Sequence, residues 1–202
     1  MKRSRSLAGA LAAIGFAAGL TMAGIGTARA DVIPPSGTWA EIFDPYIHPQ
    51  GFSLCVDNPS GSTNIEKIQL FHCHGYASNG GPQRWFFTPV SQYNKNTGTI
   101  FTVYQIRNQS SGLCIGFPET FPTAVDLIQE PCGSGIFDTQ WALEPVNPAS
   151  SNPDFQLETL EPRLTYVGHW CMAASNFTGN SPTRLVAEPC EPTDTRQLWN
   201  LG

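Results

Sequence analysis

The sequence predicts an all-β protein built from three copies of one structural unit. Three markers, namely a cysteine, a second cysteine and a tryptophan, recur in the same order at nearly constant spacing. Short apolar or alternating runs are separated by turns rich in Gly, Pro, Asn and Ser, and no window of a dozen residues shows a helical stripe. A fixed period of this size indicates one supersecondary unit that is used repeatedly.

The period is kept by all three markers. The first cysteines stand 59 and 57 residues apart, at Cys55, Cys114 and Cys171. The second cysteines stand 59 and 58 residues apart, at Cys73, Cys132 and Cys190. The tryptophans stand 56 and 58 residues apart, at Trp85, Trp141 and Trp199.

Strands are expected at the short apolar runs between the turn clusters. The segment 39–43, WAEIF, is the expected opening strand of the first unit, and the other runs are 67–71, 101–106, 125–129, 155–160 and 184–188. Proline is expected between strands, at Pro89, Pro145 and Pro148, because its nitrogen cannot donate to a strand ladder.

The first thirty residues have the pattern of a secretory signal peptide. A basic start, MKRSRS, is followed by a small apolar core and by ARA before Asp31. A membrane anchor is the alternative, but no stop-transfer charges follow the apolar core. Since no other stretch reaches the ~18 apolar residues of a membrane span, we expect a soluble, secreted, extracellular protein with one domain over 31–202.

The charge balance limits the partners. Residues 31–202 carry 7 basic and 16 acidic side chains, a net charge of −9. Such a surface repels nucleic acid and anionic membranes. A neutral glycan or polysaccharide is the natural partner class, and a protein partner is the other possibility.

All six cysteines lie in the part expected to be exported, where disulfides persist. Six cysteines allow fifteen pairings, and the repeat selects one that serves all three units: Cys55–Cys73, Cys114–Cys132 and Cys171–Cys190. The alternative is a metal site at residues 72–74, His-Cys-His. It is disfavoured because no other copy has histidines there, so we expect neither metal nor cofactor.

The chain resembles the repeat of ricin-type β-trefoil lectins in three motifs taken together: Cys-x-Asp, an apolar-Gln-apolar-aromatic-x-Cys run, and Gln-x-Trp. Full Gln-x-Trp motifs stand at 83–85 and 197–199, whereas the second copy reads Thr139-Gln140-Trp141. The resemblance covers 39–202 and implies a β-trefoil with repeats of roughly 39–95, 96–152 and 153–202. The repeats are longer than is usual in the family, and the excess is expected in loops between them.

The resemblance also implies roles for single residues. The three tryptophans would fill equivalent core positions near a threefold axis. In the first repeat, Asp57 would accept hydrogen bonds from sugar hydroxyls, Phe71 would stack on the sugar ring, and Gln69 and Gln83 would complete the pocket. The usual asparagine is replaced by Pro82, so Asn79 or His74 would have to compensate. Asp57 could instead be a turn residue of the segment DNPSG.

The second and third repeats depart from this pattern. Gly116 and Ala173 stand where the aspartate is expected, and Glu130 and Glu188 replace the aromatic platform. We expect these carboxylates to be solvated rim residues, and we expect one sugar site rather than three.

Three functions follow from these residues. The first is a secreted, lectin-like carbohydrate-binding protein without catalytic activity. The second is a β-trefoil scaffold for protein recognition, such as a hydrolase inhibitor, since loops on a rigid scaffold often carry function. The third is a glycosidase that uses two carboxylates, for which Glu130, Glu144, Glu158 and Glu188 are available. Nothing in the sequence pairs these glutamates, which disfavours an enzyme.

Overall fold

The computed structural model describes residues 34, 37–47, 51–75, 81–95, 98–117, 125–133, 139–146, 154–160, 168–176 and 182–202. These residues form strands and three short 3-10 turns, η2 (Pro59–Gly61), η3 (Gly81–Gln83) and η5 (Thr195–Gln197). The all-β prediction is confirmed. The expected signal segment 1–30 and Asn79 lie outside the described residues. Over the described ranges, no helix has the length and apolarity to cross a membrane.

The strands fall into three groups of similar order. The first group is β1 (Ile42–Asp44), β2 (Leu54–Asp57), β3 (Gln69–His72) and β4 (Trp85–Lys95). The second is β5 (Thr99–Asn108), β6 (Cys114–Gly116), β7 (Val125–Asp126), β8 (Ile128–Glu130) and β9 (Trp141–Pro145). The third is β10 (Phe155–Thr159), β11 (Trp170–Ala174), β12 (Thr183–Pro189) and β13 (Asn200–Leu201).

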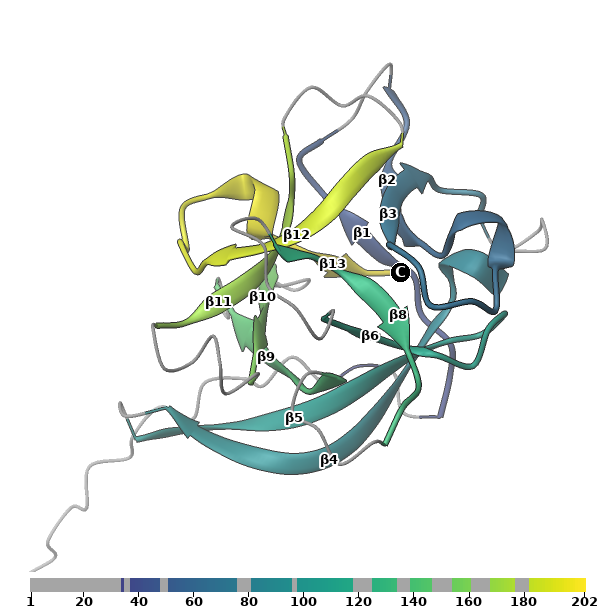
Figure 1. Cartoon of the computed structure of the whole chain (residues 1–202). Helices are drawn as coiled ribbons and strands as arrows, with labels where there is room; N and C mark the ends of the chain where they lie inside the picture. The colour runs from purple at the N-terminus through teal and green to yellow at the C-terminus, as the bar shows by residue number, and fades with distance from the viewer. Residues whose placement is uncertain are drawn as a thin grey trace, which may run out of the picture.

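The first and last strands of each group form a closed ring of antiparallel neighbours (Figure 1). Going round the ring, β1 pairs with β13, β9 with β10, and β5 with both β4 and β9. Two isolated bridges, Ala40 to Trp85 and Phe155 to Trp199, close the remaining gaps. Closure leaves few unpaired strand edges, which removes the main route to edge-to-edge aggregation.

The middle strands of each group form three hairpins, β2–β3, β6–β8 and β11–β12, which meet one another. The Ile68 N–H donates to the Leu127 carbonyl at 3.1 Å, and the Leu127 N–H donates to the Leu185 carbonyl at 2.9 Å. These three residues have equivalent positions in the repeats and are fully buried. A closed ring with three equivalent hairpins is the β-trefoil, as predicted.

The three tryptophans occupy equivalent buried positions in the core. Each indole Nε1 donates to the backbone carbonyl of the residue after the first cysteine of its repeat. The acceptors are Val56, Ile115 and Met172, at 2.8, 2.9 and 3.1 Å. The expected core role is therefore met, and the repeated hydrogen bond fixes each ring against its own hairpin.

All three expected disulfides are formed, Cys55–Cys73, Cys114–Cys132 and Cys171–Cys190. Each joins the two strands of one hairpin near its base. Because Cys73 is in a disulfide, it has no thiolate to offer a metal ion. The metal site considered at residues 72–74 therefore lacks its cysteine ligand.

Between Trp85 and Cys114, the extra length that was expected in a loop forms a hairpin instead. Strands β4 and β5 pair from Trp85–Asn108 to Lys95–Thr99 and form a long hairpin, seen as the two long ribbons at the bottom of Figure 1. Pro89 was expected between strands but lies inside β4, where the pairing register shifts. A bulge accommodates a proline because the ladder is interrupted there. Pro145 ends β9, and Pro148 lies outside the described residues.

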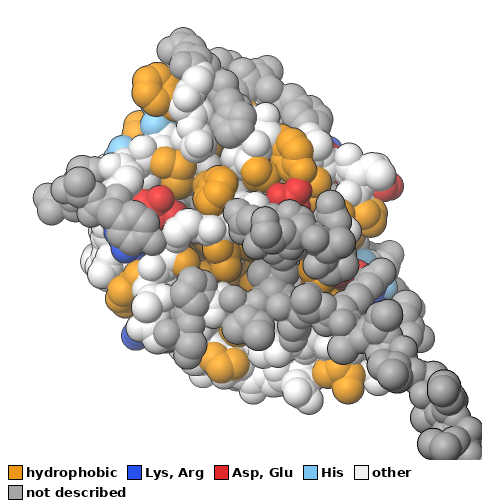
Figure 2. Space-filling model, turned by 180° about the vertical axis from the view of Figure 1, so that it is seen from behind, with side chains coloured by type: hydrophobic (Ala, Val, Ile, Leu, Met, Phe, Trp, Pro, Cys, Tyr) orange, Lys and Arg blue, Asp and Glu red, His pale blue; other side chains and the backbone are white. Residues whose placement is uncertain are grey.

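The coloured side chains on the face in Figure 2 are mostly uncharged or apolar, with few charged groups. This agrees with the composition, in which Asp, Glu, Lys and Arg make up 13% of the residues.

Candidate functional site

A pocket of about 250 Å³ opens on the first repeat, beside the paired strands β2 and β3 and the turns η2 and η3. Its lining residues are Asp57, Pro59, Ser60, Gln69, Phe71, His74 and Pro82. Four of the side chains singled out from the sequence thus line one pocket: Asp57, Gln69, Phe71 and His74.

Asp57 ends β2 directly opposite Gln69 on β3. Residues opposite each other in antiparallel strands face the same side of the sheet, and Gln69 Nε2 donates to Asp57 Oδ2 at 2.9 Å. Burial raises the pKa of the Asp57 carboxyl, while hydrogen bonds from Gln69 and Gln83 and the charge of His74 act in the opposite direction. The result is an oriented carboxylate, 4% exposed, at the pocket wall.

The turn after β2 is held by Asn58 rather than by Asp57. Asn58 Nδ2 donates to the Ser62 carbonyl at 2.9 Å, and the Asn58 N–H donates to the Pro82 carbonyl at 3.0 Å. The Asp57 carboxylate instead meets Gln69 across the strands. Within the same turn, Ser60 has φ 54° and lines the pocket. Left-handed conformations of residues other than glycine cluster at functional sites.

An aromatic wall stands beside these polar groups. Phe71 is half-buried, and its ring meets the His74 ring edge-on, with centroids 5.5 Å apart and planes at 80°. Both rings line the pocket. The arrangement combines a flat apolar surface with a polar ring and suits a ligand that has one apolar face and polar edges.

Gln83 requires a correction, because it was counted among the sugar contacts. It is fully buried, at 0% exposed, so it offers no surface to a ligand. Its Nε2 donates to the His72 carbonyl at 2.9 Å, and its Oε1 accepts from the His74 N–H at 2.8 Å. Gln83 therefore positions the backbone on both sides of Cys73, and through it the aromatic wall.

The third repeat uses the same device. Gln197 Nε2 donates to the Pro189 carbonyl at 2.9 Å, and its Oε1 accepts from the Glu191 N–H at 2.8 Å. In the second repeat the equivalent position is Thr139, which is buried and accepts a hydrogen bond from Gln105 Nε2 at 3.0 Å. In the repeat with the displaced motif, this buried position is therefore held by a different hydrogen bond from the two that the glutamine makes in the other repeats.

In the second repeat, a glutamate fills the place of the pocket. The Phe117 N–H donates to Glu130 Oε1 at 3.1 Å. A Cβ atom added to Gly116 would lie only 1.9 Å from the same Oε1. The carboxylate thus occupies the space that an aspartate side chain would need, and Glu130 is not the solvated rim residue that was expected.

In the third repeat, ion pairs fill the equivalent place. Arg196 Nη2 contacts Glu188 Oε2 at 2.8 Å and Asp194 Oδ2 at 2.6 Å. Burial raises the pKa of Asp194, but the hydrogen bonds and charge of Arg196 outweigh this and leave the pKa below its ordinary value. Glu188, whose side chain is 31% exposed, is therefore a rim carboxylate as expected, but one that is paired with an arginine.

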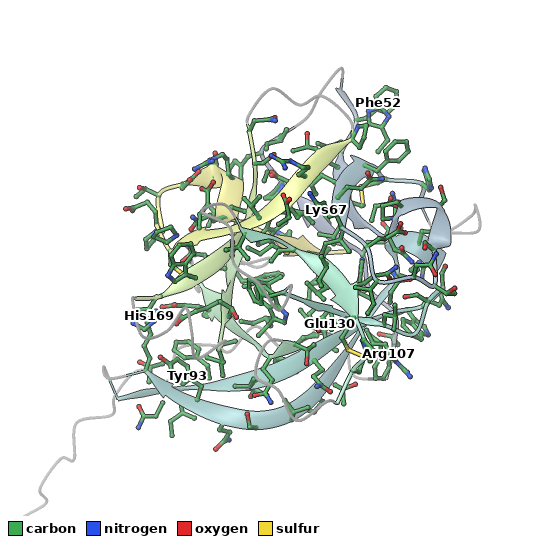
Figure 3. All side chains as sticks on the ribbon, in the orientation of Figure 1. Phe52, Lys67, Tyr93, Arg107, Glu130 and His169 are labelled. Carbon is green, nitrogen blue, oxygen red and sulfur yellow. A yellow bond between two sulfur atoms is a disulfide. The ribbon has the colours of Figure 1, made fainter. Side chains whose placement is uncertain are left out.

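The structure pairs two of the four glutamates considered for catalysis. Lys95 Nζ contacts Glu144 Oε2 at 2.5 Å and Glu158 Oε2 at 3.1 Å, and His169 Nδ1 contacts the other oxygen of Glu158. Figure 3 shows His169 and Tyr93 on the same side of the molecule, near the far end of the β4–β5 hairpin. The sequence did not reveal this cluster, because Lys95 lies at the end of β4, far along the chain from the two glutamates.

This cluster suits a structural role. The ammonium group of Lys95 lies between the two carboxylates, and Glu158 is 1% exposed. A glycosidase needs two carboxyl groups that reach opposite sides of a bound substrate. Here both are engaged by one lysine, which fastens the long hairpin to β9 and β10.

The comparisons with known proteins agree on the fold. The designed threefold-symmetric protein ThreeFoil is 14% identical, with a TM-score of 0.60, and the match covers 81% of this chain and 96% of that one. The Haemophilus ducreyi cytolethal distending toxin is 12% identical, with a TM-score of 0.57 and coverages of 84% and 87%. The Macrolepiota procera ricin B-like lectin, solved in complex with lactose, is 16% identical, with a TM-score of 0.55 and coverages of 84% and 97%.

No protein-family model matches the chain, and no curated protein sequence matches it either. At these identities the structural likeness shows the fold alone. The chain is a β-trefoil whose structural neighbours include ricin B-like lectins.

Proposed function

We propose that this protein is a secreted, lectin-like carbohydrate-binding β-trefoil, related to the ricin-type lectins, with one sugar site in the first repeat and no catalytic activity. The observation that supports it most directly is the contrast among the repeats. The first repeat keeps an open pocket with an oriented carboxylate, whereas the equivalent places in the other two are filled by their own side chains.

The chemistry of the pocket suits a sugar ring. Ionised carboxylates accept stronger hydrogen bonds than neutral groups, so Asp57 would accept from two neighbouring hydroxyls. Gln69 orients Asp57 and offers its own amide. Phe71 would stack against the C–H face of the ring, and His74 would supply the polar edge that Pro82 lacks.

Two further observations support the proposal. The Macrolepiota procera lectin was solved with lactose, so a β-trefoil neighbour of this chain binds a sugar. Three disulfides in the described residues are typical of proteins that fold in an oxidising compartment, which supports secretion.

One site per chain implies weak binding of a single glycan. Lectins with several sites gain apparent affinity because the second binding event is intramolecular. With the second and third places filled, this chain would gain avidity only from a polymeric ligand that several molecules decorate.

The test is binding of the purified protein to a panel of glycans and insoluble polysaccharides, with Asp57→Ala and Phe71→Ala measured in parallel. Both changes should abolish retention while the circular dichroism spectrum and melting temperature stay close to those of the parent. Phe52→Ala is the matched control, since this exposed phenylalanine is not among the pocket-lining residues. Binding that survives both pocket changes would refute the proposed site.

The protein-recognition scaffold remains the alternative, and the long β4–β5 hairpin favours it. Val90 and Ile100 are exposed apolar side chains on its two strands. If no glycan binds at millimolar concentration, and an immobilised hydrolase panel retains the protein unless Val90→Ser and Ile100→Ser are combined, this alternative replaces the lectin proposal.

A further inference from the structure

The outer row of the sugar pocket continues onto a third strand. Asp57 on β2 lies opposite Gln69 on β3, and Gln69 lies opposite Arg184 on β12. Directly opposite residues face the same side of a sheet. The next residues along β3 and β12, Leu70 and Leu185, belong to the buried core, so this row faces outward.

A second cation lies beside Arg184. Lys67 precedes β3 by two residues and contacts the same carboxylate as Arg184, that of Asp126. The isolated bridge to Ile128 places Lys67 where β3 meets β8, near β12, and Figure 3 labels it there. The side chains of Lys67 and Arg184 are 59% and 61% exposed. Two exposed cations thus lie near Gln69, just beyond the residues that line the pocket.

One carboxylate holds the two cations together. Asp126 Oδ2 contacts Lys67 Nζ at 2.5 Å, and its Oδ1 contacts Arg184 Nη1 at 3.2 Å. The side chain of Asp126 is only 15% exposed, whereas those of Lys67 and Arg184 reach solvent. An ammonium group has three donors and a guanidinium group has five. One carboxylate therefore leaves donors and a net positive charge directed outward.

We propose that the glycan bound at this site carries an anionic group, a carboxylate or a sulfate, which is held by Arg184 and Lys67. The inference rests on the proposed function and specifies its ligand class, in place of the neutral glycan that the overall charge suggests. Asp57, Gln69 and Phe71 hold one sugar ring, and the anionic group lies one unit further along the row.

The distances suit this arrangement. Neighbouring strands lie about 4.8 Å apart, so Asp57 and Arg184 are separated by about 10 Å across β3. That span leaves room for a linked second ring or a charged substituent on the first. The anionic group is then kept away from the Asp57 carboxylate, which it would repel.

The net negative charge of the chain does not oppose this. Charges further away than about 8 Å are largely screened at physiological ionic strength. At the contact itself, Arg184, Lys67 and Asp126 together carry a charge of +1.

The test compares glycans that differ only in charge. The probes are oligogalacturonate beside its methyl-esterified form and a sulfated galactan oligosaccharide beside its desulfated form, measured by calorimetry or interferometry at low and physiological salt. We expect at least one acidic probe to bind about three- to tenfold more tightly than its neutral form, with the difference shrinking as salt rises. The carboxylate and sulfate arms identify the anionic group.

Arg184→Gln and Lys67→Gln should each reduce this preference, and together they should remove it without weakening the neutral form. Arg107→Gln is the matched control, because it removes an exposed cation that lies over Trp39 and Phe86 instead. If acidic and neutral forms bind equally, and Asp57→Ala still abolishes binding, the anionic subsite is refuted and the proposed function stands. If none of these probes and no glycan of the panel binds, both the anionic subsite and the proposed function are refuted.

Discussion

Replacing Gln83 by alanine gives the sharpest test of how the fold supports the site. The side chain is fully buried, and its amide satisfies the His72 carbonyl and the His74 N–H at 2.9 and 2.8 Å. Removing it leaves two backbone groups without these partners. Each lost hydrogen bond to a buried group costs ~1–2 kcal/mol, so Gln83→Ala should lower the free energy of unfolding by about 2–4 kcal/mol.

The third repeat offers a matched control. Gln197 makes the same two backbone hydrogen bonds, at 2.9 and 2.8 Å, and accepts a third from Gln156 Nε2 at 3.0 Å. Gln197→Ala should therefore destabilise the protein at least as much as Gln83→Ala. Only Gln83→Ala should also weaken glycan binding, because only its backbone partners carry the aromatic wall of the pocket.

The assay is urea unfolding with the disulfides intact, followed by tryptophan fluorescence, together with glycan binding at a temperature where both variants stay folded. In a domain of this size 1 kcal/mol shifts the melting temperature by about 2–4 °C. A loss below about 1 kcal/mol in either variant would refute the hydrogen-bond argument. Equal loss of glycan binding in both would show that stability, and not the local geometry, controls the site.

Three further predictions concern single residues. The difference in unfolding free energy between the parent and Asp57→Asn should depend on pH. Because the pKa of Asp57 is raised above its ordinary 3.8, the parent should lose stability relative to the variant as the pH rises from 3.8 through the raised pKa. Glycan binding by the parent should instead fall as the pH drops through the same range, because the carboxylate becomes protonated, and parallel pH titrations of unfolding and of binding check both. Trp141→Ala should cost about 3–5 kcal/mol, since it empties a fully buried site and leaves the Ile115 carbonyl without its indole donor, and a loss under 2 kcal/mol in urea unfolding would contradict this. Ser60→Gly should raise the free energy of unfolding by about 0.5–1 kcal/mol, because φ 54° suits glycine, and a lowered melting temperature would contradict it.

The sequence by itself determined the fold. The period of Cys, Cys and Trp set the three units, the disulfide pairing and the core tryptophans, because equivalent positions in a repeat have the same surroundings. The resemblance to ricin-type repeats, rather than the period, singled out Asp57, Gln69 and Phe71. The structure brings them together because they lie on two strands of one hairpin whose register the disulfide and the hydrophobic alternation fix.

Only the tertiary structure decided what fills each pocket and what lies beside it. That Gln83 is buried, that Glu130 folds over Gly116, and that Arg196 pairs with Glu188 depend on side-chain directions that spacing does not encode. The clusters at Lys95 and at Arg184 join residues separated by tens of positions, because strands of different repeats are neighbours in the closed barrel and its hairpins. A local pattern specifies which way a strand faces, whereas contacts between repeats exist only after the barrel closes.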